Sequence, residues 1–136
     1  MELKIYTDGG SLCNPGPAAS AFVVFYQNKI LTSHAEKIGI QTNNVAEYMG
    51  LVLALEKTLS LLPSFPSATS VAVFSDSSLM VNQLKGVFRI KKKHLGEFVQ
   101  RVRGLEKRIG LPVAYHHVPR EENVLTDSLV KKALGR

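Results

Sequence analysis

The chain has 136 residues and a formal net charge of +6, with hydrophobic residues at 45% of positions and charged residues at 21%. This composition is typical of a folded globular protein, and we expect a single domain over residues 1–136. No apolar run approaches the roughly 18 residues of a membrane span. The first ten residues also lack the pattern of a secretory signal, so we expect a cytoplasmic protein without a membrane partner. Cys13 is the only cysteine, which excludes an internal disulfide and a cysteine-based zinc site.

The positive charge is concentrated in the second half of the chain. Residues 69–136 hold 13 of the 17 lysines and arginines but only six of the 11 acidic residues. Such a basic half favours a polyanionic partner, for which a phosphate backbone is the usual candidate. A solvated, solubilising surface explains the charge equally well. Nothing in the sequence demands an oligomer, so we expect a monomer.

The first half predicts three strands and a helix. Residues 3–7 form an apolar strand that the Gly9-Gly10 pair stops, and residues 20–38 form two strands with a hairpin turn at 27–29. A helix follows over residues 42–62, where apolar residues recur at the helical period. The polar side chains before its first apolar residue can cap its start; they are Thr42, Asn43 and Asn44.

The second half alternates strands and helices. Residues 71–75 and 111–118 predict strands, and residues 77–85, 91–109 and 123–134 predict helices. The two later strands arrive through helical crossovers, which favours parallel pairing with the first strand. The fold class is therefore α/β. We expect a five-stranded mixed sheet, with its first three strands antiparallel, two more parallel to the first, and helices on both faces.

Four carboxylates stand out by their positions. Asp8 ends the first predicted strand, Asp76 ends the fourth, Glu47 lies in the first turn of the long helix, and Asp127 lies in the last helix. Each has a structural explanation by itself: Asp8 bracing the following turn, Glu47 completing a capping box, Asp76 capping the next helix and Asp127 lying solvated on a helix surface.

Together, the four carboxylates predict a metal site. The carboxyl ends of neighbouring parallel strands meet at one edge of the sheet, where ligands bind in open sheets. Crowded carboxylates resist joint ionisation unless a cation neutralises them. Without a cysteine cluster, the expected ion is Mg²⁺, with Mn²⁺ as a substitute. A pair of such ions about 3.5–4 Å apart suits in-line displacement at phosphorus.

The four segments that carry these residues resemble type 1 ribonuclease H. They are YTDGGSLCNPGPAA, TNNVAEYMGLVLAL, VFSDSSLMVNQLKG and VPREENVLTDSLVKKAL, they occur in this order, and the resemblance spans essentially the whole chain. The resemblance implies a ribonuclease H-like fold and endonucleolytic hydrolysis of the RNA strand of an RNA–DNA hybrid. The products would carry 5′-phosphate and 3′-hydroxyl ends.

The same resemblance implies residue roles. Asp8, Glu47, Asp76 and Asp127 fall on the four metal-binding, catalytic carboxylates of the family. Asn14, Asn43 and Asn44 fall on positions that contact the minor groove of the hybrid, and Thr42 on a position that contacts a DNA phosphate. The backbone of Gly9, Gly10 and Ser11 would lie along the RNA 2′-hydroxyls, which distinguish RNA from DNA. Helix capping by the asparagines is the alternative, and both roles are compatible.

The chain departs from the family pattern in the loop after the last strand. Many members carry a histidine there that assists turnover, whereas this loop is only PREEN. His116 and His117 precede it within the strand, and strand alternation puts them on opposite faces, so we expect one to be buried and one exposed. A structural role for both is the favoured interpretation. Glu121 or Glu122 assisting proton transfer or product release is the alternative.

The chain also lacks the long basic protrusion of larger relatives. It has instead the compact segment FRIKKKH, in which Lys92 stands where relatives often have an asparagine and Phe88 where they often have a tryptophan. We expect four cations of this segment to contact the DNA strand: Arg89, Lys91, Lys92 and Lys93. A solvated helix start is the alternative, although the helix dipole disfavours cations at that end.

Two rival functions follow from the same fold. One is a module that binds hybrids without cutting them, although a pure binder gains nothing from four acidic residues facing phosphate. The other is a nuclease or strand transferase that acts on DNA, against which the Thr42–Glu47 segment and the single-domain length argue. Whether double-stranded RNA is also cut stays open at this point.

Overall fold

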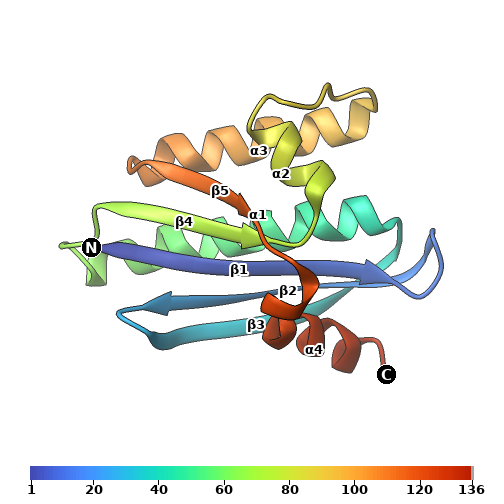
Figure 1. The fold of residues 1–136 in the computed structure, drawn as a ribbon, viewed down its shortest axis with the longest axis horizontal. Coiled ribbons are helices and arrows are strands. Elements are labelled where there is room, and N and C mark those ends of the chain that lie inside the picture. Colours follow the sequence, from blue (N-terminus) through green and yellow to red (C-terminus); the bar gives the residue numbers. More distant parts are fainter. Residues whose placement is uncertain (136) are drawn as a thin grey trace.

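The computed structural model describes residues 1–135. This part of the chain forms five strands and four α-helices, with two short 3₁₀ turns between them (Figure 1). The elements are β1 (Glu2–Ser11), β2 (Gly16–Tyr26), β3 (Lys29–Gln41), α1 (Asn43–Leu61), η1 (Leu62–Ser64), β4 (Ser70–Ser75), α2 (Ser78–Leu84), α3 (Lys93–Ile109), β5 (Val113–His117), η2 (Arg120–Glu122) and α4 (Val124–Ala133).

The strands form one mixed sheet in the order β3-β2-β1-β4-β5. The three N-terminal strands are antiparallel to one another, while β4 runs parallel to β1 and β5 parallel to β4. The predicted sheet is therefore confirmed. The hairpin between β2 and β3 turns through Gln27 and Asn28, whose φ values of 51° and 63° suit a two-residue turn of the type that matches strand twist.

The helices cover the two faces of the sheet unequally. Helices α1, α2 and α3 lie on one face, and α4 packs alone against β1, β2 and β3 on the other (Figure 1). The main core lies under α1 and is built from Leu3 and Ile5 of β1, Leu51 and Leu55 of α1, and Val73 of β4, all fully buried. A smaller cluster of Ala19, Ala21 and Val130 holds α4 in place.

Several boundaries differ from the sequence-based expectation; for example, β2 begins at Gly16 and β3 ends at Gln41, outside the expected 20–38. Strand β1 does not stop at Gly9 but continues to Ser11, because β2 keeps pairing with it as far as Ala18 opposite Ser11. Helix α1 begins at Asn43, so Glu47 lies in its second turn and not its first. Helix α3 begins at Lys93, so the two preceding lysines lie in the loop before it.

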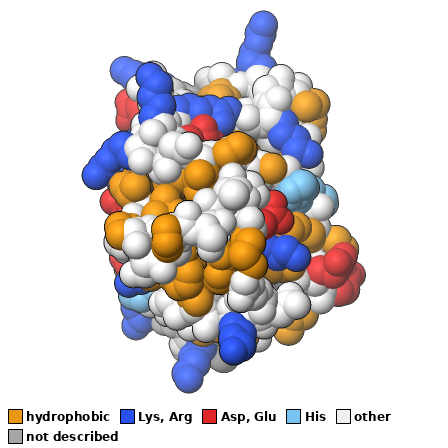
Figure 2. Space-filling model, turned by 90° about the vertical axis from the view of Figure 1, so that its left-hand side faces the viewer, with side chains coloured by type: hydrophobic (Ala, Val, Ile, Leu, Met, Phe, Trp, Pro, Cys, Tyr) orange, Lys and Arg blue, Asp and Glu red, His pale blue; other side chains and the backbone are white. Residues whose placement is uncertain are grey.

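The two ends of the sheet differ in character. At the end where β1 begins and α1 terminates, hydrophobic side chains gather across the surface and lysines and arginines lie around them (Figure 2). Met1, Tyr26 and Phe65 meet there, with the two aromatic ring centroids 5.0 Å apart. The opposite end carries Asp8, Glu47 and Asp76. No helix among residues 1–135 is both long and apolar enough to cross a membrane.

Candidate metal centre and nucleic-acid interface

Three of the four predicted carboxylates converge at one end of the sheet. Asp8, Glu47 and Asp76 each offer an oxygen atom, and these atoms all lie within 4.8 Å of one another. Asp76 directly follows the last residue of β4, as the sequence predicted. Asp8 lies inside β1, two residues past the last one that pairs with β4, because that pairing ends at Tyr6 opposite Phe74.

Close backbone contact between α1 and β1 brings Glu47 to Asp8. A methyl group on Gly9 would overlap the backbone carbonyl of Ala46, and one on Gly50 would lie 2.7 Å from the carbonyl oxygen of Asp8. The Ser20 hydroxyl of β2 also donates a hydrogen bond to the Ala46 carbonyl at 2.7 Å. Gly9 is therefore needed where α1 crosses the strand. A Cβ on Gly10 would meet nothing closer than 3.7 Å.

Burial and mutual repulsion raise the pKa values of the clustered carboxylates. Asp8 is 5% exposed and Glu47 is 9% exposed. Desolvation, followed by repulsion from Asp76, raises the pKa of Asp8 from 3.8 to about 7, although the Gly9 amide donates to its Oδ1 at 2.9 Å. Desolvation and the charge of Asp8 raise the pKa of Glu47 as well. The pKa of Asp76 is raised mainly by burial.

These carboxylates fit a divalent cation. Within residues 1–135, Oε2 of Glu47 is buried and has no hydrogen-bond partner, which is costly unless a ligand supplies one. Closely spaced carboxylate oxygens are the donors that Mg²⁺ and Mn²⁺ prefer. A bound ion would also offset the repulsion that raises the pKa values. The structure removes two of the structural explanations for single carboxylates, since Ser77 and not Asp76 caps α2, and the cap of α1 is Thr42, five residues before Glu47.

Asp127 lies at the same site but outside the group of three. It lies in the first turn of α4, and its carboxylate pairs with Lys131 one turn later at 2.9 Å. Asp127 lines a cleft of about 320 Å³ together with Asp8, Glu47 and the Gly9–Ser11 backbone. Its charge contributes to the raised pKa of Asp8, which places it within electrostatic reach of the cluster.

The predicted substrate-contacting residues around the start of α1 form a hydrogen-bonded unit. Thr42 is the N-cap of the helix and accepts from the Val45 amide at 3.2 Å. Asn14 accepts from the backbone amide of Asn43 at 3.0 Å, and the Asn43 side chain accepts from the Ser11 amide at 2.9 Å. Both asparagine carbonyls are thus held by protein amides, while both side chains are exposed.

The predicted basic segment borders a separate groove. This groove, of about 460 Å³, runs beside the start of α1 and is lined by Asn44, Leu79, Gln83, Val87, Phe88, Arg89, Lys91, Lys92 and Leu95. It contains three of the four predicted cations; Lys93, which begins α3, is exposed but is not among the lining residues. Val87 and Phe88 are 67% and 44% exposed, which is unusual for large apolar side chains.

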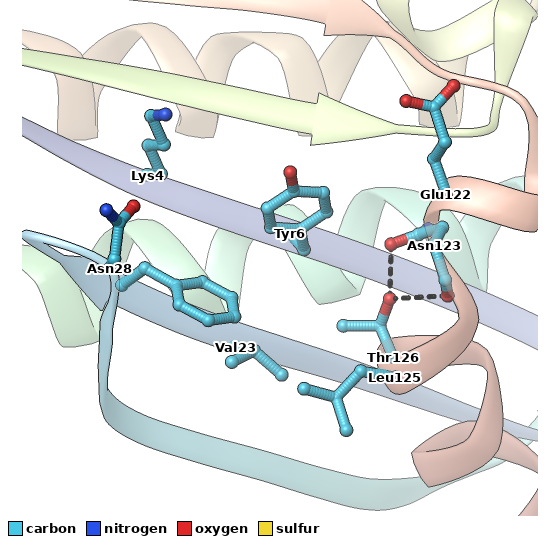
Figure 3. Close-up of a pocket in the computed structure, with 9 residues that line it drawn as sticks. Lys4, Tyr6, Val23, Asn28, Glu122, Asn123, Leu125 and Thr126 are labelled. Atoms are coloured by element: carbon cyan, nitrogen blue, oxygen red, sulfur yellow. Dashed lines mark hydrogen bonds between the residues drawn. The ribbon is translucent and has the colours of Figure 1, made fainter.

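The loop after β5 differs from what the sequence suggested. We expected one of the two histidines to be buried, but both are exposed: β5 is an edge strand, α4 packs against β1, β2 and β3 and not over the face that carries His116, and His117 is the last residue of the strand. His116 stacks on Phe74 with ring centroids 5.1 Å apart. Neither glutamate of the loop lines the cleft. Glu122 instead lines a hollow of about 350 Å³ beside Tyr6, Phe25 and Leu125 (Figure 3).

Sequence reasoning missed three polar residues at the site. Arg120 and Lys131 line the cleft, and Arg120 places its Nε 3.9 Å from an oxygen of Asp76. Asn123 is 1% exposed and links α4 to β1. The clue to Arg120 was its place in the short loop, but neither spacing nor composition indicated which of the loop's side chains would face the cleft.

A mixed sheet in this strand order, with carboxylates on β1, directly after β4 and on the helix between these strands, defines a ribonuclease H-type protein. Residues 6–133 match the reverse transcriptase-like family, and the chain belongs to that family. Its fold and its recognition as a ribonuclease H-type chain are thus confirmed.

Individual relatives agree with this assignment. The chain is 35% identical over 136 residues to the bifunctional protein Rv2228c of Mycobacterium tuberculosis, covering 98% of this chain but only 36% of that protein. It is 35% identical to ribonuclease HI of Halobacterium salinarum, covering 98% and 64% of the two chains. The crystal structure of LC11-RNase H1 in complex with an RNA/DNA hybrid superimposes with a TM-score of 0.88, at 35% identity and 98% and 96% coverage. The chain therefore spans about a third of the length of the mycobacterial relative.

Proposed function

We propose that this chain is a metal-dependent endonuclease that hydrolyses the RNA strand of RNA–DNA hybrids. The observation that carries the proposal is the cluster of Asp8, Glu47 and Asp76, with oxygens within 4.8 Å and one buried oxygen unpartnered. A protein that only bound nucleic acid would have no use for buried carboxylates facing phosphate. The similar LC11-RNase H1 has been crystallised with an RNA/DNA hybrid, which supports the substrate class.

The carboxylates would hold two divalent ions, Mg²⁺ or Mn²⁺ as its substitute. Asp8, Glu47 and Asp76 are the proposed inner ligands, and Asp127 would complete the site from α4 by exchanging its Lys131 partner for an ion. When bound, such ions activate a water and stabilise the leaving oxygen. Burial of Asp8 and Glu47 excludes bulk water from the cluster, which strengthens their attraction for cations.

The proposed reaction is an in-line displacement at phosphorus. The oxygen of a water molecule forms a bond to the scissile phosphorus, and the bond from phosphorus to the 3′ oxygen breaks. The attacking water loses a proton to solvent, and the 3′ oxygen acquires one. The products are a 5′-phosphate and a 3′-hydroxyl end.

The end of β1, the loop after it and the start of α1 would recognise the RNA strand. The backbone of Gly9–Ser11 borders the cleft, and Gly10 leaves space above the strand for a ribose 2′-hydroxyl. The carbonyl oxygens of Asn14 and Asn43 accept from protein amides, so their NH₂ groups are left to donate outward. The minor groove displays acceptor atoms on every base pair, which suits sequence-independent binding by such donors.

The basic groove would hold the DNA strand. Thr42 and Asn44 lie at the N-terminal end of α1, where backbone amides favour a phosphate. Across the groove from Asn44, Arg89, Lys91 and Lys92 supply positive charge, and Phe88 offers an exposed ring against which a deoxyribose can pack. Lys93 would extend this contact at the start of α3.

Arg120 would act in the loop that lacks a histidine. Its side chain is 82% exposed yet lies beside Asp76, so it can approach a phosphate at the cleft without being part of the core. The cleft is not lined by any of the four alternatives, His116, His117, Glu121 and Glu122. This favours Arg120 as the residue of this loop that assists turnover.

The proposal is tested by incubating the protein with one end-labelled RNA–DNA hybrid, a matched RNA duplex and a matched DNA duplex, each in Mg²⁺, in Mn²⁺ and in EDTA. We expect cutting of the RNA strand of the hybrid in either metal and none in EDTA. Binding without cutting would support the hybrid-binding module instead, and cutting of the DNA duplex would support a DNA nuclease. The monomeric state and the cytoplasmic location stay predictions.

A further inference from the structure

Asn123 occupies an unusual position at the start of α4. The side chain is 1% exposed, and its amide nitrogen donates to the backbone carbonyl of Thr7 at 2.9 Å, across 116 residues of sequence. Its side-chain oxygen accepts from the hydroxyl of Thr126, which is fully buried (Figure 3). The Asn123 side chain accepts from no backbone amide in the first turn of its own helix, so ordinary helix capping does not explain its burial.

The acceptor of this bond is the residue next to Asp8. Pairing between β1 and β4 ends at Tyr6, so the Thr7 carbonyl lies beyond the last strand partner on that side. Buried carbonyl groups need a partner, and Asn123 supplies it. The backbone of Val118 meanwhile donates to Ser75 at 2.9 Å, so residues 118–123 cross the end of β4 directly beside Asp76. Asn123 also favours the charged form of Asp76, which offsets part of the rise in its pKa.

The backbone of Asn123 is hydrogen-bonded to two residues that line the cleft, Asp127 and Arg120. Its carbonyl accepts from the amide of Asp127 at 3.0 Å, and its amide donates to the carbonyl of Arg120 at 3.0 Å. Arg120 and Asp127, which both line the cleft, are therefore each one backbone hydrogen bond from Asn123. Asn123 is in turn one hydrogen bond from the strand that carries Asp8.

We infer that Asn123 is a positioning residue that fixes Asp127 and Arg120 relative to the cluster of Asp8, Glu47 and Asp76. The inference deepens the proposed function and rests on it. Asp127 is the one carboxylate outside the group of three, and it is carried by a helix that packs alone on its face of the sheet. The amide of Asn123 ties the start of that helix to β1, and so keeps the fourth carboxylate within reach of a cation.

The test compares Asn123→Ala and Asn123→Asp with the wild type. Thr58→Ala is the matched control, because Thr58 is also fully buried and hydrogen-bonded but lies near the far end of α1. Mn²⁺ affinity of the free protein is measured by isothermal titration, and kcat and KM are measured on the hybrid, at a temperature where all variants are folded by circular dichroism. Residues that orient metal ligands typically change affinity or activity by about 10–100-fold when replaced.

We expect Mn²⁺ affinity and kcat to fall by about tenfold or more in both Asn123 variants, with KM little changed, and neither to fall in Thr58→Ala. Wild-type Mn²⁺ affinity and kcat in Asn123→Ala would overturn the inference and leave the proposed function standing. Equal losses in Thr58→Ala would also overturn it, because the effect would then be one of general stability. A wild type that binds Mn²⁺ but cuts nothing would refute the proposed function, while the affinity measurement would still decide the role of Asn123. A wild type that binds no Mn²⁺ would overturn both.

Discussion

The substitution Asp8→Asn should stabilise the metal-free protein at neutral and alkaline pH. Asp8 is 5% exposed, and burial and neighbouring carboxylates raise its pKa from 3.8 to about 7. At pH values between these two pKa values, Asp8 therefore keeps its proton in the folded state but has lost it in the unfolded chain. The free energy of unfolding must fall as pH rises from about 4 to about 7, because the native state binds more protons in this range.

The size of the effect follows from the two pKa values. A tenfold change in proton affinity corresponds to about 1.4 kcal/mol, so the shift of Asp8 corresponds to at most about 4 kcal/mol at pH 8. Asparagine has nearly the same shape, keeps an acceptor for the Gly9 amide and carries no charge. We expect Asp8→Asn to exceed the wild type by about 2–4 kcal/mol at pH 8, or on the order of 10 °C in Tm.

The assay is urea unfolding in EDTA, followed by circular dichroism at pH 4.5 and pH 8. Glu56→Gln is the control, because it removes an exposed carboxylate of α1. The gap between Asp8→Asn and the wild type should be large at pH 8 and small at pH 4.5. Mg²⁺ at pH 8 should stabilise the wild type and the control but hardly affect the variant. A variant no more stable than the wild type at pH 8, or a gap that is equal at both pH values, would refute the reasoning.

Three further predictions concern the surroundings of the cluster. Gly9→Ala should lower the free energy of unfolding by about 2 kcal/mol or more, since the added methyl overlaps the α1 backbone, whereas Gly10→Ala should fold normally and raise KM for the hybrid. Equal urea midpoints for the two variants would contradict the difference in stability. Replacing Lys91, Lys92 and Lys93 by alanine should raise KM and weaken its dependence on salt, with kcat little changed. The control, Lys107→Ala with Arg108→Ala at the other end of α3, should leave the salt dependence of KM unchanged. An unaltered salt dependence in the triple variant would rule out the DNA contact. Arg120→Ala should lower kcat about tenfold but change the free energy of unfolding by less than about 0.5 kcal/mol, because the side chain is 82% exposed. Arg120→Lys should recover part of the rate. A wild-type kcat in Arg120→Ala would exclude a role for Arg120 in turnover.

The sequence predicted the fold because its signals are local. Apolar strands, the helical period of residues 42–62 and the hairpin turn at Gln27-Asn28 each depend on neighbours in the chain. Crossover logic then placed β4 beside β1, which brought Asp76 close to Asp8. The boundaries were less accurate where tertiary pairing overrides local preference, as in β1, where pairing with β2 carries the strand through two glycines.

The parts of the site that the sequence could not predict depend on contacts between distant segments. Gly9 was interpreted as space for RNA, but the contact that requires it is with Ala46 of α1. Asn123 reads as a helix start, and only the structure shows its bond to Thr7. Strand alternation assigned the two histidines to opposite faces, but it does not predict whether another element covers either face.

The most direct test of the account is single-turnover cleavage of an end-labelled RNA–DNA hybrid in Mg²⁺ by the wild type, Asp8→Asn and Glu56→Gln. The account predicts that the wild type and Glu56→Gln cut the RNA strand at the same rate, leaving 5′-phosphate and 3′-hydroxyl ends. It predicts no cutting by Asp8→Asn, although this variant stays folded and binds the hybrid. Cleavage by Asp8→Asn at the wild-type rate, or no cleavage by the wild type, would contradict the claim that the carboxylate cluster is the catalytic centre.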